Sequence, residues 1–411
     1  MERTIKILDL IVFSLICLFI FYLPVSSAII EVSSCSAIFF WLVKRIIQSK
    51  KKDLIFFSDN PLRLPIFLFM AVLLISVIQG SETSIGLRHF LRKTLQYIGI
   101  FYVILDTLNS AKRIKIVSGF LIASIILVAS DCLWQYFFKF EFLRHRVAVS
   151  GRISGPFEYP DQFGNYWVTV LSVVFAFFLS RIKNKINFFL LTFLLFIMVF
   201  IFLINNSKGS LLAFLFVYFF FFWFTRRKLF LILIPVFFVI GGIFLSPFYK
   251  ELIVRQLDFK NSSYTQRFDL WETGILMFKD KPLFGQGLGS YMSNYERFQS
   301  KKNRPLAEQG IWYAHNSYLQ MLSETGLIGL LSFLLIVAVI FKNILAAFRG
   351  LKDEQFFSLL LGFSGGLLGY LVQIFSDSTY YSLANSVLFW FFLGVVSSIL
   401  IVLKNNKYKT D

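Results

Sequence analysis

The sequence predicts an all-α polytopic membrane protein with about twelve transmembrane helices and one large, partly helical loop outside the membrane. Three observations predict this class. Of the 411 residues, 57% are hydrophobic and only 16% are charged, whereas about a quarter of the residues in a soluble domain are charged. The mean hydropathy is +0.71. The apolar residues also come in blocks of about 20, the length that crosses the hydrocarbon core of a bilayer as a helix.

Twelve apolar blocks qualify as spans. They lie at 8–24, 27–44, 64–80, 90–108, 114–138, 164–180, 187–204, 209–224, 229–246, 324–342, 355–376 and 383–403. The first block, with basic residues before it, is also typical of a signal peptide, but a second block follows at once and favours a retained span. The chain is therefore predicted to hold helices 1–9 in residues 1–246, a loop in 247–323, and helices 10–12 with a cytoplasmic tail in 324–411.

Basic residues orient these spans, because cytoplasmic connections of membrane proteins collect Lys and Arg. Alternate connections carry such residues, namely Lys44, Arg45 and 50–52, then Lys112, Arg113 and Lys115, then Arg181, Lys183 and Lys185, then 226–228, then Lys342, Arg349 and Lys352, and finally Lys404, Lys407 and Lys409. Assigning them to the cytoplasm puts both termini inside and the 247–323 loop outside. These connections also account for the net charge of +18, so nucleic acid is not expected as a partner.

Positive charges in the outward connections are not explained by the preference of Lys and Arg for cytoplasmic connections, so they require another cause. These connections contain Arg88, Arg92, Arg144, Arg146, Arg152, Lys208 and Arg267. An anionic ligand at the outer leaflet is one cause. The alternative is that the long side chains snorkel to lipid headgroups.

The outer loop contains one segment with helical spacing. Apolar residues recur at positions 268, 271, 275 and 278 within Thr265–Phe278, which predicts a helix. This helix is expected to lie along the bilayer surface or to pack on the spans. Either arrangement leaves Arg267 near the headgroup plane, where a guanidinium binds phosphate with two parallel hydrogen bonds.

A turn-rich stretch follows this helix. Gly285, Gly287 and Gly289 come after Pro282, but the stretch lacks the Lys-Ser/Thr of a nucleotide-binding P-loop. Glycine accepts backbone conformations that other residues avoid. The stretch is therefore predicted to turn the backbone sharply between two helices.

His315 is the side chain best suited to accept a proton near neutral pH, and it directly precedes the tenth span. Asn316 beside it is expected to bond a sugar hydroxyl or to orient the ring. A lone histidine is also common as a structural residue, and both interpretations remain open at this point. The outward acids show no Asp-x-Asp pair of the kind that holds a divalent ion, so neither a metal nor another cofactor is expected.

In four stretches the chain resembles the O-antigen ligase and polymerase superfamily of bacterial membrane glycosyltransferases. Arg152–Asp161 is similar to an Arg-x-x-Gly-x-x-x-x-Pro-Asn pattern, with Asp161 in place of the usual Asn. Asn206–Ser210 is similar to a Ser-Arg-Gly turn, with Lys208 in place of Arg. The remaining two are Arg267 with Pro282–Tyr291, similar to Arg followed by Pro-x-x-Gly-x-Gly, and His315–Asn316 with Glu324–Gly329, similar to His-Asn followed by Glu-x-Gly-x-x-Gly.

The resemblance implies an undecaprenyl-diphosphate-linked glycan as donor and transfer without a metal ion. It implies that Arg152, Lys208 and Arg267 bind the diphosphate, and Arg88 is a further candidate for this role. His315 is implied as the base for the acceptor hydroxyl, with Arg267 as its catalytic partner. The lipid bilayer and a lipid A-core acceptor are the expected partners, at the periplasmic face of the bacterial inner membrane.

Three activities within the superfamily compete. The single dominant outer loop favours an O-antigen ligase of lipopolysaccharide biosynthesis over a polymerase of lipid-linked repeats, and a protein O-oligosaccharyltransferase is third. A lipid-glycan flippase, from a different class, would need polar residues at mid-span. Such residues are nearly absent, since Asp106 and Asp131 lie near span ends. A structural subunit of an envelope assembly also remains possible.

Overall fold

The structure, a computed structural model, describes residues 2–49, 60–147, 151–179, 184–225, 262–299 and 313–407. Within these ranges it consists of helices and their connections, without a named strand, which confirms the predicted all-α class. In chain order the helices are α1 (Glu2–Tyr22), α2 (Ser27–Ser49), α3 (Arg63–Gln79), α4 (Thr83–His89), η1 (Phe90–Thr94), α5 (Leu95–Thr107), α6 (Ala111–Phe138), α7 (Pro160–Leu179), α8 (Lys185–Asn205), α9 (Lys208–Thr225), α12 (Ser262–Asp280), α13 (Tyr291–Phe298), α15 (Ser317–Phe348), α16 (Glu354–Gln373), η4 (Thr379–Tyr381) and α17 (Leu383–Lys407).

Nine of the described helices are long and apolar enough to cross a membrane. Two further predicted spans are also helical: α3, with 17 residues, and the continuous run α4–η1–α5. Helices therefore occupy eleven of the twelve predicted positions. The twelfth position, 229–246, lies outside the described residues, as do the basic group 226–228 and the loop segments 247–261 and 300–312.

Three helices form the buried centre of the bundle. α7, α16 and α17 are buried along most of their length, whereas α8 exposes most of its apolar side chains. Glycine brings the central helices close together: a Cβ added at Gly366 would lie 2.7 Å from the carbonyl oxygen of Thr169 on α7. This close packing of α7 on α16 matters for the site, because the segments at one end of both helices carry its residues.

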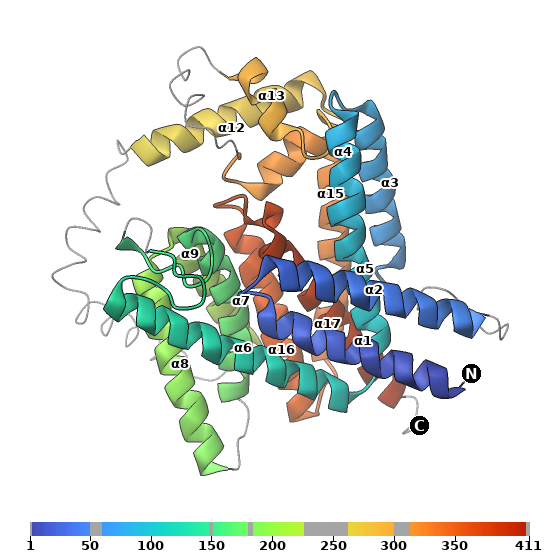
Figure 1. Cartoon of the computed structure of the whole chain (residues 1–411), viewed down its shortest axis with the longest axis vertical. Coiled ribbons are helices and arrows are strands. Elements are labelled where there is room, and N and C mark those ends of the chain that lie inside the picture. The colour runs from blue at the N-terminus through green and yellow to red at the C-terminus, as the bar shows by residue number, and fades with distance from the viewer. Residues whose placement is uncertain are drawn as a thin grey trace.

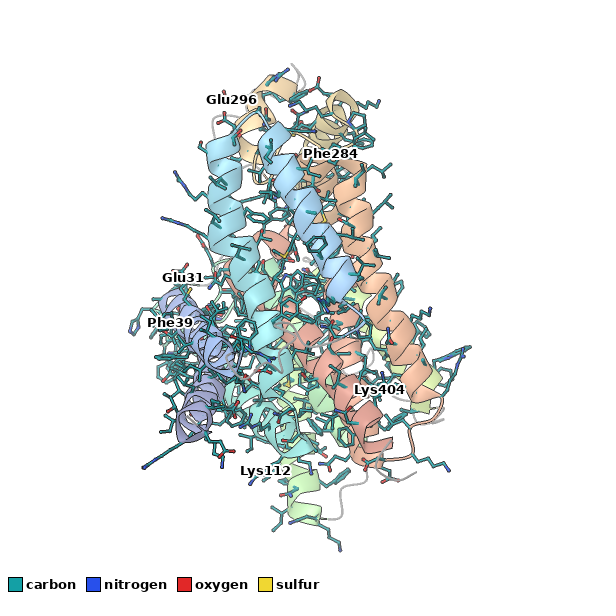
Figure 2. All side chains as sticks on the ribbon, turned by 90° about the vertical axis from the view of Figure 1, so that its right-hand side faces the viewer. Glu31, Phe39, Lys112, Phe284, Glu296 and Lys404 are labelled. Carbon is teal, nitrogen blue, oxygen red and sulfur yellow. The ribbon has the colours of Figure 1, made fainter. Side chains whose placement is uncertain are left out.

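The two ends of the bundle differ in character. Figure 2 shows Lys112 and Lys404 at one end and Phe284 and Glu296 at the other, as the predicted topology requires for cytoplasmic and outer residues. At the first end, five charged residues of α1, α2, α5 and α6 form one ion-pair cluster. Lys44 binds Asp9 at 3.0 Å and Asp106 at 2.6 Å, Arg45 binds Asp106, and Arg113 binds Asp9.

At the other end, α12 and α13 pack on the upper part of α15, beside the upper ends of α3 and α4 (Figure 1). The predicted helix Thr265–Phe278 is confirmed as the inner part of α12. Its predicted apolar stripe includes Phe268 and Ile275, which are exposed, whereas Leu270 and Met277 on another side are buried. The stripe therefore remains available for a bilayer surface, while a different face packs on the bundle.

The predicted domain boundaries stay predictions. The first, between residues 246 and 247, falls outside the described residues. The second, between 323 and 324, falls inside α15, shortly before a kink at Gly326, where φ is +68°. The helix that contains this span thus begins at Ser317, earlier than the apolar pattern alone indicates.

Candidate active site

Arg152 is fixed where three segments meet at the start of α7. Its Nε donates to the carbonyl oxygen of Asn205 at 3.1 Å, and its Nη2 donates to Oδ1 of Asp161 at 2.9 Å. The same carboxylate oxygen accepts from the Ser207 hydroxyl at 2.8 Å. Asp161, where the resembled family has Asn, therefore serves here as an anionic clamp that ties Arg152 to the turn before α9.

Lys208 reaches this region because α8 and α9 are joined by a very short turn. Asn206 adopts a left-handed conformation that ends α8, as Asn often does at a helix C-terminus. Lys208 is then the first residue of α9 and is exposed. The next residue must be small, since a Cβ added at Gly209 would lie 1.7 Å from the Ser376 hydroxyl.

Arg267 extends from α12 and contacts Ser376, the residue on which Gly209 packs. Its Nη1 donates to the carbonyl oxygen of Ser376 at 2.8 Å, and among the described residues its other guanidinium nitrogens make no hydrogen bond. A guanidinium carries five N–H donors. Most donors of Arg267 are therefore available for a ligand, beside the Lys208–Gly209 turn that packs on Ser376.

His315 is paired with an acid that follows Ser376 directly. Its Nδ1 lies 2.8 Å from Oδ1 of Asp377, with the histidine side chain 42% exposed and the aspartate 14% exposed. The backbone of His315 has a φ of +45°, a sparsely populated region that costs free energy and is found disproportionately at functional sites. The ring is thus held at one nitrogen and open to solvent.

Asp377 is a functional candidate that the sequence analysis missed. It is the only acid in the short outward connection 377–382, and this position could have marked it as a candidate site residue. Its pairing with His315 spans 62 positions of sequence. A single acid outside any recognised motif gives no hint of that partner.

A chain of hydrogen bonds inside the bundle joins the Arg152–Asp161 pair to the segment that carries Ser376 and Asp377. Gln373 at the end of α16 donates to the backbone carbonyl of Asp161 at 3.1 Å and accepts from the Thr379 hydroxyl at 3.0 Å. The Asn165 amide donates to that hydroxyl at 2.8 Å. The segment that carries Ser376 and Asp377 is therefore held rigidly against the Arg152–Asp161 pair.

Glu324 has a structural role that the motif alone did not reveal. Its Oε2 accepts from the backbone N–H of Gly289 at 2.9 Å, and its Oε1 accepts from that of Tyr291 at 3.3 Å. Gln320 donates to Oε1 at 3.2 Å. Burial and the nearby Glu324 carboxylate raise the pKa of Tyr381 above its ordinary value, so this phenol stays protonated and able to donate to Glu324.

The glycine stretch turns sharply, as predicted. Gly285, Gly287 and Gly289 have φ values of +72°, +121° and +73°. The stretch wraps around the kink in α15, where a Cβ added at Gly326 would lie 2.2 Å from the carbonyl oxygen of Leu283. The last two motifs of the resembled pattern are therefore one structural unit, and it fixes the start of α15 just after His315.

Two of the predicted site residues, Asn316 and Arg88, are not joined to the other site residues by a described side-chain contact. Asn316 is the N-cap of α15, and its Oδ1 accepts from the backbone N–H of Leu319 at 3.0 Å. It is 7% exposed, so binding of a sugar by this side chain remains a prediction. Arg88 lies on α4, exposed, and no described contact joins it to Arg152, Lys208 or Arg267.

Comparisons with known proteins agree with this arrangement. Residues 191–334 match the protein family described as O-antigen ligase, and this region includes Lys208, Arg267 and His315. An uncharacterized protein of Haemophilus influenzae is 32% identical to the chain over 82 residues, which are 19% of this chain and 20% of that protein. The chain therefore matches about a fifth of that relative's length.

The matched region holds three of the four motifs, and the structure brings these three together with the fourth, at Arg152, around residues 373–379 of a multi-pass helical bundle. Over residues 191–334 this chain is therefore similar to the O-antigen ligase family.

Proposed function

We propose that the protein transfers a glycan from undecaprenyl diphosphate to the lipid A-core oligosaccharide, as an O-antigen ligase of lipopolysaccharide biosynthesis. The observation that carries this proposal is the adjacency of Ser376 and Asp377. One holds the Arg267 guanidinium and the other holds the His315 ring. A proton acceptor and a cation thus share one short segment, as displacement of a diphosphate from a sugar requires.

The proposed reaction is a single displacement. With Asp377 accepting the Nδ1 proton of His315, Nε2 is the ring nitrogen left to take a proton from the acceptor hydroxyl. The oxygen of that hydroxyl forms a bond to the anomeric carbon of the first donor sugar. The bond from this carbon to the diphosphate oxygen breaks, and the electron pair leaves with the lipid diphosphate. Attack opposite the leaving group inverts the anomeric centre.

The leaving diphosphate gains negative charge, which preorganised cations stabilise. Arg267 has donors that no described residue uses, and Lys208 precedes Gly209, which packs on the same Ser376 that Arg267 contacts. Arg152 is partly neutralised by Asp161, so it is proposed to position the diphosphate more weakly than Arg267 does. In this proposal side-chain cations do the work of a metal ion, at the periplasmic face of the bacterial inner membrane.

The test uses the purified full-length protein in lipid nanodiscs with an undecaprenyl-diphosphate-linked glycan and lipid A-core. Wild-type protein should attach the glycan to the core, and His315→Ala should lose transfer while keeping its thermal unfolding midpoint. Exposed His145→Ala serves as the matched control and should keep full activity. Normal turnover by His315→Ala would remove this residue from the role of base.

The acceptor that is used decides between a ligase and a polymerase. Attachment of glycan to lipid A-core supports a ligase. Extension of one lipid-linked repeat by another, with lipid A-core left unmodified, would instead identify a polymerase that uses the same residues.

A further inference from the structure

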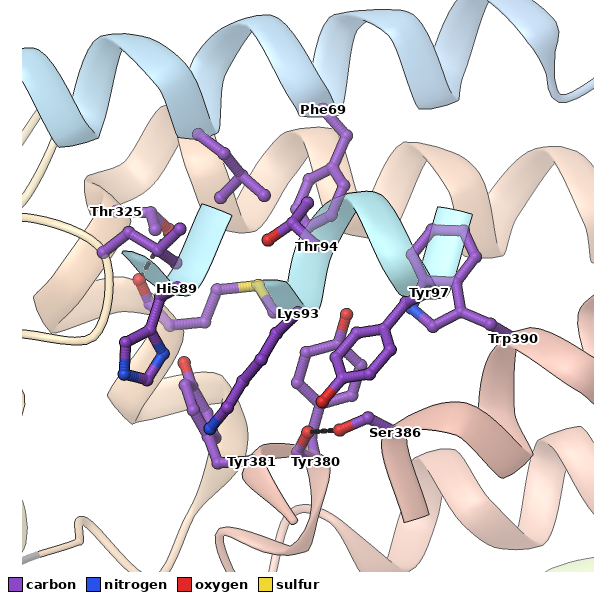
Figure 3. A pocket seen from close by; sticks show the side chains of 13 residues that line it. Phe69, His89, Lys93, Thr94, Tyr97, Thr325, Tyr380, Tyr381, Ser386 and Trp390 are labelled. Carbon is purple, nitrogen blue, oxygen red and sulfur yellow. Dashed lines mark hydrogen bonds between the residues drawn. The ribbon is translucent and has the colours of Figure 1, made fainter. Parts of the chain in front are cut away.

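A cavity lined by one lysine lies next to the candidate active site. Its volume is about 60 Å³, several times the roughly 10–15 Å³ that one water molecule needs. It is lined by α3, the α4–η1–α5 run, the glycine stretch, α15, η4 and the start of α17. Its lining includes aromatic side chains and Lys93, as Figure 3 shows. None of its lining residues belongs to the Arg152, Lys208, Arg267 and His315 set.

Lys93 points into this cavity from a distortion in its helix. It belongs to η1, a single turn of π-helix between α4 and α5, and such turns occur frequently at functional sites. The neighbouring Leu91 and Arg92 are exposed, whereas Lys93 is half-buried. The distorted turn thus directs one basic side chain inward while its neighbours face outward.

No described acid neutralises Lys93. Among the described residues none lies within ion-pair distance of its ammonium group, and the carboxylates whose charge reaches it are those of Glu324 and Glu31. Glu324 already accepts three hydrogen bonds from Gly289, Tyr291 and Gln320. A cation against apolar walls is costly unless it is paired, so the cavity favours an incoming anion.

The remaining lining matches a phosphate attached to a larger molecule. Thr94 and Tyr97 bring hydroxyl groups to the cavity, and Phe69 and Trp390 bring aromatic faces. The hydroxyls of Thr325 and Ser386 also line it, but they already donate to backbone carbonyls. Hydroxyls and an ammonium group donate to phosphate oxygens. The aromatic faces suit the apolar part of the same molecule.

A shared wall separates this cavity from His315. Tyr380 and Tyr381 line the cavity, while the backbone N–H of Tyr380 donates to the Ser317 hydroxyl, which donates to the carbonyl of Asp377. Arg267 and Gly209 contact Ser376, at the opposite end of this segment. The segment 376–381 therefore has one set of cations at one end and Lys93 at the other.

We propose that the Lys93 cavity binds a phosphate-class anionic group of the acceptor substrate. This inference rests on the proposed function, in which two lipid-anchored molecules must meet at His315. The first set of cations takes the donor's diphosphate, and Lys93 holds the acceptor on the other side of the wall. The phosphate of an ordinary bilayer lipid has the same chemistry, so the experiments separate the two sources.

The first experiment measures binding without transfer. The full-length protein in neutral detergent is titrated with dihexanoyl phosphatidic acid, and with dihexanoyl glycerol as a probe that lacks phosphate. A ligand that binds the native state raises the unfolding midpoint. The phosphatidic acid should raise it in wild type, Lys93→Arg and the exposed-charge control Arg92→Gln, but not in Lys93→Met. An equal rise in Lys93→Met, or its loss in Arg92→Gln, would overturn the anion site.

The second experiment measures transfer kinetics in phosphatidylcholine nanodiscs. Lys93→Met should raise the acceptor KM on the order of tenfold, the factor that ~1.4 kcal/mol represents, with the donor KM and kcat unchanged. Lys93→Arg should restore the acceptor KM. An unchanged acceptor KM, together with a lost response to phosphatidic acid, would assign the cavity to bilayer phospholipid and overturn the acceptor role. Binding of the probe without any wild-type transfer would reject the proposed function and leave the anion site standing.

Discussion

At the residue scale, the candidate site depends on which partner holds each charged side chain. His315 is held by Asp377, Arg152 by Asp161, and Arg267 by a backbone carbonyl. A carboxylate partner fixes a ring tautomer but also neutralises a cation, whereas a carbonyl leaves the positive charge of the guanidinium intact. Similar contacts therefore have different consequences at the three positions.

The His315–Asp377 pair leads to the first prediction at this scale. Asp377→Asn should lower kcat by roughly 10²–10⁴-fold, the range for a positioned acid or base, because an amide can donate to Nδ1 and so favour the wrong ring tautomer, and because it lacks the charge that stabilises the protonated ring. Substrate KM values should change little, and the loss should depend on pH. Steady-state kinetics over a pH series checks this. The exposed acid Glu296→Gln is the control, and an Asp377→Asn enzyme with wild-type kcat would contradict the positioning role.

The clamp on Arg152 leads to a second prediction. Asp161→Asn keeps an acceptor for the Ser207 hydroxyl but removes a negative charge from the diphosphate site. The donor KM should therefore stay constant or fall by up to a few-fold. Transfer should continue. Titration with donor at saturating acceptor measures this. Loss of transfer in Asp161→Asn would mean that the carboxylate itself takes part in the reaction.

At the element scale, the glycine stretch and the start of α15 act as one unit. The stretch bonds to α15 through the backbone, with the N–H of Gln286 donating to Ser323 and that of Gly287 donating to Glu324. It also bonds to the connection before α4, where the N–H of Ser81 donates to Gln286. One short stretch therefore holds α12, α15 and the α3–α4 connection in register above the site.

This unit predicts a position-specific cost for an added methyl group. Gly326→Ala should lower the unfolding midpoint and the yield of folded protein, since its φ of +68° costs about 1–3 kcal/mol for a residue with a side chain. The backbone carbonyl 2.2 Å away cannot move aside easily. Gly350→Ala, where nothing lies within 4 Å of the added carbon, should be neutral. Equal midpoints for the two variants would contradict the described kink.

At the scale of the whole molecule, the two ends carry different groups of charged residues. The ion-pair cluster of α1, α2, α5 and α6 lies at one end, and the candidate site and α12 lie toward the other (Figure 1). The positive-inside rule assigns the first end to the cytoplasm. The orientation in the membrane is a prediction from this rule and can be measured directly.

Cysteine labelling tests this orientation. In a Cys35→Ser background, Lys279→Cys on α12 should react with a membrane-impermeant maleimide added to spheroplasts, whereas Lys112→Cys and Lys352→Cys should react only after lysis. All three positions are exposed in the structure, so access depends on the side of the membrane. The reverse labelling pattern would place the candidate site in the cytoplasm and reject the proposed reaction.

The sequence by itself determined the class of the protein, the positions of helices at eleven of the twelve predicted spans, the helix that carries Arg267 and the sharp glycine turn. These features are local. Helix length, apolar periodicity and positive φ at glycine depend on residues that are close together along the chain. The four motifs also identified the segments that form the site, although not how those segments meet.

Only the tertiary structure decided which side chains meet. Asp377 pairs with His315, Asp161 neutralises Arg152, and Asn316 caps a helix. Lys93 enters a cavity because its helix contains a π turn. Such contacts depend on the rotation and register with which distant helices pack, since a small rotation of one helix changes which side chains face its neighbour. No local pattern in the sequence encodes that rotation.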